Sequence, residues 1–200
     1  MKVVSPASAR LALVSSAPEP EDEARLVAEL ARGDLAALAR SYDRWHQRVR
    51  IFARRLLSDE AAAEDVVQEV FGALPRAASR FRGSVGLETF LLAIAVKRAR
   101  RHQRAALRRR RALARLADET HGGPRDPEHH AYRRELGLRL TVALDRLPLP
   151  QRTAFVLCVV EGMTSAQASL VAAAPEATVR TRVHHARLRL RQWLAEEWDE

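Results

Sequence analysis

The chain has 200 residues, enough for one ordinary domain or for two small helical ones. Hydrophobic residues make up 47% and charged residues 30%, and this composition, rich in Ala, Leu and Arg, can build packed cores and favours helices over strands. A formal charge of +9 predisposes the chain to polyanions such as nucleic acid, an acidic protein or an anionic membrane surface, although free use of Arg on the surface explains the charge equally well.

The cysteine count and the hydropathy pattern indicate the compartment in which the protein is expected to act. Cys158 is the only cysteine, so an intramolecular disulfide framework is excluded, and its apolar neighbours predict a buried packing thiol in a reducing cytoplasm. No stretch approaches the roughly 18 uninterrupted apolar residues of a membrane span, and the apolar run at residues 11–14 is too short for a signal peptide. We therefore expect a cytoplasmic protein without a membrane span.

The N-terminal part of the chain predicts a tail followed by a helix. Residues 1–22 contain three prolines and no apolar period, which is typical of disorder. Asp34 is a plausible N-cap for the helix that follows. Its apolar residues recur at steps of three and four, at Leu35, Leu38, Tyr42, Trp45, Val49, Phe52 and Leu56.

A second and a third helix are expected next. Ser58 or Asp59 can cap the second, and Pro75 should end or bend it. Residues 80–88 contain two glycines and predict a loop. The third helix has an apolar face from Leu87 to Ala95 and then enters residues 97–111, which carry nine Lys or Arg and no acid. Like-charge repulsion opposes this stretch unless a polyanion or solvent screens it.

Residues 112–135 contain glycines, prolines and mixed charges, the composition of a mobile linker. The second helical unit begins near Leu136 and is broken at Pro148 and Pro150. A helix over residues 151–161 should stop at Gly162, and a T-x-x-Q capping box from Thr164 to Gln167 opens a short helix. A longer helix starting near residue 175 follows, which completes a helix-turn-helix pattern with a basic second member.

Two blocks of sequence resemble the extracytoplasmic-function sigma factors of bacterial RNA polymerase. Residues 63–71, AEDVVQEVF, are similar to a conserved helix of the first domain of that family. The LP..QR and EG.T patterns in residues 147–164, with TVRTRVHHAR at residues 178–187, are similar to the second domain. The chain departs from the family at Lys97, where Asn is usual, at Arg101, where Asp is frequent, and at Ala173, where Gly is common.

The resemblance implies an all-α fold of two small domains joined by a flexible linker. Residues 1–22 would form a disordered tail, residues 23–104 a region 2-like domain, residues 105–135 the linker, and residues 136–196 a region 4-like helix-turn-helix domain. The implied function is to bind RNA polymerase core and direct it to promoters with −10 and −35 elements. The implied partners are polymerase core, through the clamp helices of its largest subunit, promoter DNA, and an anti-sigma factor as a hypothesis.

The resemblance also assigns residues of the first domain. The acid-bearing helix would bind the polymerase clamp through Glu64, Asp65, Gln68, Glu69 and Phe71. The loop at residues 81–88 and the helix after it would meet the −10 element, where a base flipped from the non-template strand needs a shaped pocket and nearby positive charge. That charge would come from Arg82, Lys97, Arg98, Arg100, Arg101 and Arg104.

In a helix-turn-helix the second helix enters the major groove of DNA, and its exposed side chains reach base edges or phosphates. Spacings of three and four residues place Arg180, Thr181, His184 and Arg187 on one side of that helix, as candidates for −35 contacts. Thr178 and Arg182 are further DNA-binding candidates, although Arg182 could equally meet phosphate or polymerase. Neighbouring His184 and His185 diverge by about 100° on a helix and have no ligands nearby at metal spacing, so we expect no metal and no cofactor.

Three other functions compete with this interpretation. A helix-turn-helix regulator that binds operator DNA without polymerase explains residues 136–196 but leaves residues 63–71 unexplained. An enzyme lacks support, because the sequence has no Gly-rich phosphate loop, no HExxH motif and no evident His partner for Cys158. A basic RNA-binding or structural protein would bind nucleic acid without polymerase. Promoter elements about 25 base pairs apart are separated by roughly 85 Å, which favours two linked modules over one compact body.

Overall fold

The computed structural model describes residues 20–116 and 142–196. Every regular element within these ranges is a helix, as the predicted all-α fold requires. The first unit consists of α1 (Pro20–Ala31), α2 (Leu35–Leu56), α3 (Glu60–Ala78) and α4 (Leu87–Leu116). The second unit has a helical turn at residues 142–146 followed by α6 (Leu149–Phe155), its π-helical continuation η1 (Val156–Val160), α7 (Ser165–Ala172) and α8 (Glu176–Glu196).

The N-terminal caps of α2 and α3 match the sequence. The carboxylate of Asp34 accepts hydrogen bonds from the backbone N–H groups of Ala36 (2.8 Å) and Ala37 (3.3 Å). Asp59, rather than Ser58, caps α3 by accepting from the N–H of Ala62 at 3.2 Å. Each cap satisfies N–H groups that have no partner inside the helix, so the two helices begin where the sequence predicts.

The buried face of α2 differs from the predicted stripe at its N-terminal end. Leu35 and Tyr42 are exposed, whereas the small residues Ala37 and Ser41 are buried. Ser41 is accommodated because its hydroxyl donates to the carbonyl of Ala37 at 2.8 Å. Hydrophobicity alone therefore misplaced the first two turns, where close helix packing favours small side chains.

Helix α1 lies within a segment in which no helix was predicted. It begins at Pro20, so the last three residues of the predicted tail are helical, and Leu30 is fully buried. Its Glu23 side chain accepts a hydrogen bond from the N–H of Leu87 at 2.7 Å. Glu23 thus caps α4 from another helix, a function that no local pattern predicts. The other residues of the predicted tail, 1–19, lie outside the described residues.

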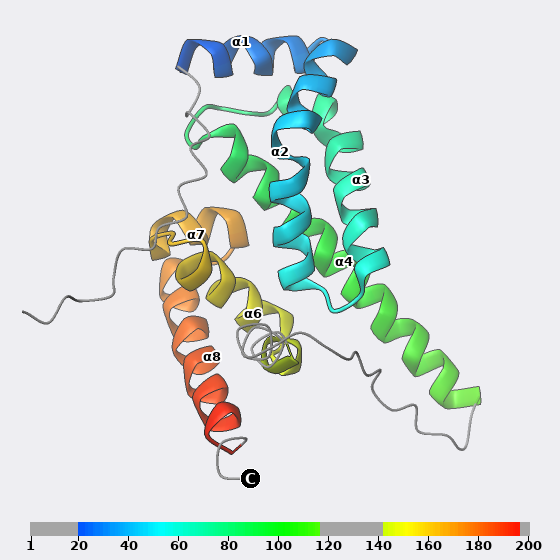
Figure 1. Ribbon diagram of the computed structural model, residues 1–200, viewed down its shortest axis with the longest axis vertical. Coiled ribbons are helices and arrows are strands. Elements are labelled where there is room, and N and C mark those ends of the chain that lie inside the picture. Colours follow the sequence, from blue (N-terminus) through cyan, green and yellow to red (C-terminus); the bar gives the residue numbers. More distant parts are fainter. Residues whose placement is uncertain (1–19, 117–141, 197–200) are drawn as a thin grey trace, which may run out of the picture.

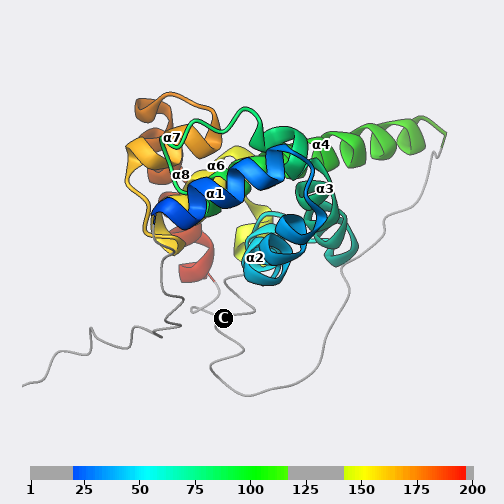
Figure 2. The same ribbon diagram turned by 90° about the horizontal axis from the view of Figure 1, so that it is seen from above.

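Two helices continue beyond positions at which the sequence suggested an end, a bend or a domain boundary. Helix α3 continues past Pro75 to Ala78, and α4 is a single helix of 30 residues that runs through the basic stretch to Leu116. The predicted domain boundary at residue 104 therefore falls inside α4, and residues 105–116 are helical. Ala, Leu and Arg are strong helix formers, and residues 87–116 contain no Gly or Pro to interrupt them. In both views the end of α4 projects beyond the other helices (Figures 1 and 2).

The second unit has the predicted helix-turn-helix caps. Gly162 has a φ of +69°, the left-handed conformation expected after the helix over residues 151–161. The Thr164–Gln167 capping box is complete, since each side chain bonds the backbone N–H of the other residue. Helix α8 begins at Glu176, with Val179, Val183, Ala186 and Leu190 buried along it.

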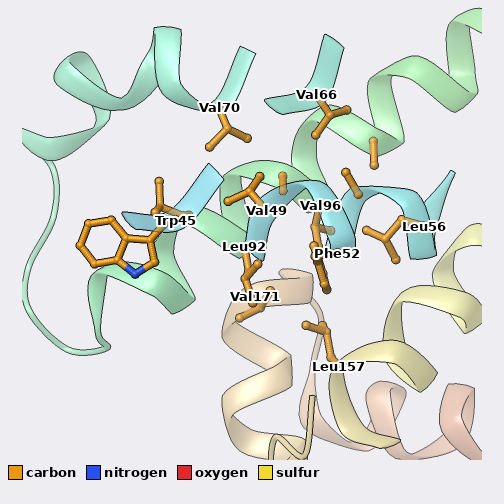
Figure 3. Close-up of a cluster of buried hydrophobic side chains, with 14 of the residues drawn as sticks. Trp45, Val49, Phe52, Leu56, Val66, Val70, Leu92, Val96, Leu157 and Val171 are labelled. Carbon is orange, nitrogen blue, oxygen red and sulfur yellow. The ribbon is translucent and has the colours of Figure 1, made fainter. Parts of the chain in front are cut away.

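The two helical units pack against each other. Leu157 of η1 and Val171 of α7 point toward Phe52, Leu92 and Val96 of the first unit, and all five side chains are buried in one core (Figure 3). In Figure 1, α6 and α7 lie beside α2 and α4. Residues 117–141, which include most of the predicted linker, lie outside the described residues.

Candidate nucleic-acid and protein interfaces

Helices α7 and α8 form the helix-turn-helix. Ala173, with a φ of 45°, turns the chain at the end of α7, and the N–H of Val179 donates to the carbonyl of Pro175 at 3.0 Å in the first turn of α8. Helix α7 packs against α8, and Val171 and Ala172 of α7 are buried in the same core as Val179 and Val183 of α8. This packing fixes the direction of α8 and leaves its other side open.

The open side of α8 carries the predicted −35 residues. Arg180, Thr181, His184 and Arg187 are exposed, whereas Val179, Val183 and Ala186 of the same helix are buried. Thr178 and Arg182 are half-buried at the edges of this face. Two of the exposed residues also have partners within the helix, since Arg180 pairs with Glu176 at 2.7 Å and the Thr181 hydroxyl donates to the Ala177 carbonyl at 3.0 Å.

Some of the cations of α4 are exposed, and others bind groups of neighbouring helices. Lys97, Arg101 and Arg104 are exposed, and so is Arg82 in the loop before the helix. Arg98 pairs with Glu69 of α3 at 3.2 Å, and Arg100 donates to the carbonyl of Ala172 at 2.5 Å. Burial lowers the pKa of Arg100, and repulsion from Arg182 and Arg104 lowers it further.

A groove of about 670 Å³ lies between α4 and α7. Its apolar lining includes Leu170 and Val171 of α7 and Val96 and Ala93 of α4. The cations that line the groove are Lys97, Arg98, Arg100, Arg101, Arg104 and Arg108. Five of these six were predicted to meet the −10 element, so the second unit borders that surface directly.

The candidate polymerase-binding residues of α3 have different environments. Asp65 and Gln68 are exposed. Glu64 pairs with Arg50 of α2, and Glu69 pairs with Arg98 and His102 of α4 at 3.2 and 3.1 Å. Phe71 is buried and packs edge-on against Tyr42, with 5.0 Å between ring centroids. Two of the five side chains are therefore exposed to solvent, and the other three make contacts that hold the first unit together.

A charged cluster that sequence reasoning missed joins the two units. Glu161, whose side chain is only 2% exposed, lies between Arg48 and Arg55 of α2. Arg55 donates to it at 2.9 Å, and Arg48 pairs with both Glu161 and Glu88 of α4. Burial works against the charge of Arg48, but its hydrogen bonds to the two acids prevail and raise its pKa. In the sequence, Arg48 and Arg55 resembled ordinary surface charges, and Glu161 entered only as part of the EG pattern.

Arg152 also has a role that the sequence did not predict, since it entered the sequence analysis only as part of the QR pattern. It is 4% exposed and donates to the carbonyl of Leu56 at 3.0 Å and to Asp145 at 2.8 Å. Burial lowers its pKa, and the charge of Asp145 opposes that shift. Leu56 is the last residue of α2, so Arg152 satisfies a carbonyl that has no partner within that helix.

The described residues hold no cluster of three or more His, Cys, Asp or Glu side chains suited to a metal ion. The rings of His184 and His185 are tilted relative to each other, with centroids 5.9 Å apart. Among the helices of residues 20–116 and 142–196, none is both long and apolar enough to cross a membrane.

Comparison with known proteins agrees with this architecture. The Sigma-70 region 2 family matches residues 41–111, and the Sigma-70 region 4 family matches residues 137–190. The ECF RNA polymerase sigma factor SigE of Mycolicibacterium smegmatis is 33% identical over 190 residues, which span 91% of this chain and 72% of the relative. The RNA polymerase sigma-H factor of Pseudomonas aeruginosa is 29% identical over 175 residues, covering 84% of this chain and 91% of the relative.

Solved structures show the same fold. CnrH, solved in complex with the cytosolic domain of CnrY, aligns with a TM-score of 0.61 at 24% identity and covers 87% of this chain and 97% of its own. The sigma factor RpoE of Bartonella quintana, solved with the anti-sigma factor NepR, aligns with a TM-score of 0.60 at 24% identity and covers 78% and 96%. Sigma factors as a class are not enzymes. The chain therefore belongs to the extracytoplasmic-function sigma factors, which bind RNA polymerase core and direct it to promoter DNA to begin transcription.

Proposed function

We propose that this sigma factor reads the −35 element with the exposed side of α8. The observation that supports this most strongly is that Arg180, His184 and Arg187 are exposed side by side on a helix whose apolar residues are anchored in a core. A helix of this kind fits the major groove, where Arg binds guanine edges or phosphate. Thr178 and Arg182, at the margins of the face, would contact the DNA backbone.

The first unit would contact the −10 element through the cations of α4 and the loop before it. Lys97, Arg101 and Arg104 are exposed along one helix, and Arg82 lies in the adjoining loop. Positive charge beside an opened strand offsets its phosphate charge while a base leaves the stack. Lys97 and Arg101 depart from the usual family residues and add two cations, so this chain should bind the −10 region with greater salt dependence than the usual family pattern gives.

Polymerase core would be bound by α3. Asp65 and Gln68 are exposed and therefore available to basic residues of the polymerase clamp, whereas Glu64 and Glu69 keep α3 aligned with α2 and α4. Phe71 would act from the core by supporting the helix that presents Asp65. An acidic patch on a basic chain suits a protein that connects polymerase to DNA better than it suits a regulator that binds DNA alone.

The chain would then consist of a region 2 unit ending with α4, a linker, and a region 4 unit ending with α8. Such a factor needs no catalysis of its own and acts in the cytoplasm, where polymerase meets the chromosome. The anti-sigma factor NepR bound to RpoE of Bartonella quintana makes an anti-sigma protein a reasonable further partner for this chain.

Run-off transcription from candidate promoters, by purified polymerase core with and without the chain, tests the proposal. We expect new start sites in its presence and their loss with Asp65→Arg, because the reversed charge would repel the clamp. Asp22→Arg in α1 is the matched control, since it makes the same charge change on another exposed acid of the first unit. Unchanged start-site choice in the presence of the chain would refute the assignment and favour a regulator that binds DNA without polymerase.

A further inference from the structure

The groove between α4 and α7 contains a row of cations along one side of α4. Its exposed members recur at steps of four, three and four residues, which places them within about 60° of one another around the helix. At a rise of about 1.5 Å per residue, the row is about 16 Å long. We name it the cation row, and it consists of Lys97, Arg101, Arg104 and Arg108.

Within the part of the chain that the structure describes, no acid balances the cation row. The groove lining has no Asp or Glu there, and no carboxylate there pairs with any of the four side chains. By contrast, Arg98 of the same helix pairs with Glu69 at 3.2 Å. Arg100, which also lines the groove, is partly buried and is repelled by Arg182 of α8 and by Arg104. An anion in the groove would relieve this repulsion.

The apolar part of the lining favours a bound anion further. Leu170 of α7 is 61% exposed, and it lines the groove together with Val171 and with Val96 of α4. Apolar surfaces exclude water, so a charge beside them is screened less, and a cleft lined by charge of one sign concentrates the electric field. The volume of about 670 Å³ lies within the range of small-ligand sites, about 300–1,000 Å³. These properties indicate a small anionic ligand.

The shape of the cation row selects the kind of anion. Three of its four members are arginines, whose guanidinium groups bind phosphate oxygens through paired N–H donors. An isolated phosphate can reach only part of a row about 16 Å long, whereas a linear chain of phosphates contacts several members at once. A DNA duplex cannot enter the groove, because Arg100 of α4 donates to the carbonyl of Ala172 of α7 at 2.5 Å and the two helices are therefore in direct contact.

We propose that the groove is a binding site for a linear oligophosphate, either inorganic or carried by a nucleoside. The phosphates lie along the cation row, and the nucleoside, where there is one, contacts Leu170 and Val171. This site goes beyond promoter recognition and does not depend on it. One consequence does rest on the proposed function: an oligophosphate bound there competes with the −10 element for Lys97, Arg101 and Arg104.

Isothermal titration calorimetry of the full chain, at fixed salt and without divalent cations, tests the site. The probes are inorganic tripolyphosphate, GTP and orthophosphate. We expect one tripolyphosphate to bind per chain, at least about tenfold more tightly than orthophosphate, because each further charge-assisted hydrogen bond adds affinity. Tighter binding of GTP identifies the nucleoside-carried form, and equal or weaker binding of GTP identifies the inorganic one. Absence of saturable binding by either oligophosphate would overturn the proposal, as would equal affinity for orthophosphate.

Two leucine variants distinguish the groove from general attraction of anions to a basic chain. Leu170→Glu adds an acid to the groove lining while every cation stays, and it should weaken tripolyphosphate binding about tenfold or more. Leu188→Glu adds the same charge at an exposed leucine of α8 that does not line the groove, and it should weaken binding less than about twofold. Equal weakening by the two would mean that net charge alone attracts the anion, and the proposal would fail.

Removal of cations provides a second comparison, which remains informative if Leu170→Glu lowers the helicity of the chain. Arg104→Gln with Arg108→Gln shortens the cation row, and we expect at least about a tenfold loss of affinity for tripolyphosphate. Arg76→Gln with Arg80→Gln is the matched control, since it removes two exposed arginines outside the groove lining. Equal losses in both pairs would contradict a site at the cation row.

Single-stranded DNA is the competing ligand, because its phosphates could also follow a row of cations. If an oligothymidine strand of about 12 nucleotides bound in the groove while tripolyphosphate did not bind, the groove would be a nucleic-acid site and the proposal would fail. These titrations contain no polymerase and no promoter, so their outcome is independent of the transcription test. Binding of tripolyphosphate without promoter-directed transcription would refute only the proposed function, and transcription without tripolyphosphate binding would refute only this site.

Discussion

Ala173 has a backbone conformation that is unfavourable for a residue with a side chain. Its φ of 45° is left-handed, a conformation that costs a residue with a Cβ roughly 1 kcal/mol or more and glycine almost nothing. Ala173 ends α7, and the chain must turn there to enter α8 in the correct direction. The helix-turn-helix therefore contains local strain that the surrounding packing tolerates.

We expect Ala173→Gly to raise the free energy of unfolding by about 0.5–1 kcal/mol, since the strain relieved exceeds the extra freedom that glycine gains in the unfolded chain. Ala39→Gly, at an exposed position inside α2, is the control and should lower the free energy of unfolding by about 0.5–1 kcal/mol. Chemical denaturation of both variants provides the measurement. Equal losses in the two would show that the turn at Ala173 is unstrained.

Cys158 carries a prediction about pH. The thiol is only partly buried, whereas its apolar neighbours had predicted full burial; this burial raises its pKa above the ordinary value, and the charge of Arg187 opposes part of that rise. The thiolate is the reactive form, so at about pH 8.5 the native chain should react with iodoacetamide more slowly than the denatured chain. The shift stabilises the fold below the ordinary thiol pKa, and this contribution is lost as pH rises through the raised one. Equal alkylation rates at this single cysteine would contradict the shift.

At the scale of single elements, α8 is bound to its core on one side and available on the other. Arg187 belongs to the open face, while Arg189 lies about half a turn away and donates to Gln151 at 3.2 Å. Arg187 and Arg189 therefore carry the same charge but point to different sides of α8. This pair allows a recognition contact to be separated from general electrostatic attraction.

Arg187→Ala should weaken promoter binding by the polymerase complex by about 1–3 kcal/mol if the side chain reads a base edge. Arg189→Ala removes the same charge from the other side and should change affinity by well under 1 kcal/mol. Titration of promoter DNA at several salt concentrations distinguishes the contacts, because losing a phosphate contact also reduces the salt slope by about 1. Similar losses in both variants would mean that charge alone matters on α8.

At the scale of the whole molecule, the two units share one hydrophobic core. Leu157 and Val171 are buried by side chains of α2 and α4 as well as by their own unit. A unit that lost its neighbour would expose these residues to water and lose stability. Unfolding of one unit should therefore be coupled to unfolding of the other.

Calorimetry of the free chain should accordingly show one transition, with calorimetric and van't Hoff enthalpies that agree. Leu157→Ala, at a fully buried position between the units, should lower the free energy of unfolding by about 2–5 kcal/mol. Leu188→Ala, at an exposed position, is the control and should change it by less than about 0.5 kcal/mol. Two resolved transitions in the unaltered chain would mean that the units are stable independently.

Local patterns determined much of this protein. Asp34, Asp59, Gly162 and the Thr164–Gln167 box were readable because a cap depends on residues within one turn of each other. The all-α class and the helix-turn-helix followed from helical periods and turn residues, and family membership followed from two blocks of sequence. The candidate DNA-binding face of α8 was predictable because exposure on a helix follows from its apolar period.

Other features were decided only by tertiary structure. The pairing of Glu161 with Arg48 and Arg55 joins residues about a hundred positions apart, and charge alone does not tell a buried pair from solvated surface residues. Glu23 caps α4 from a distant helix, and Glu69 faces α4 rather than solvent, for the same reason. The spacing of apolar residues predicts which side of a helix is apolar. Which other helix covers that side is decided only when the chain packs.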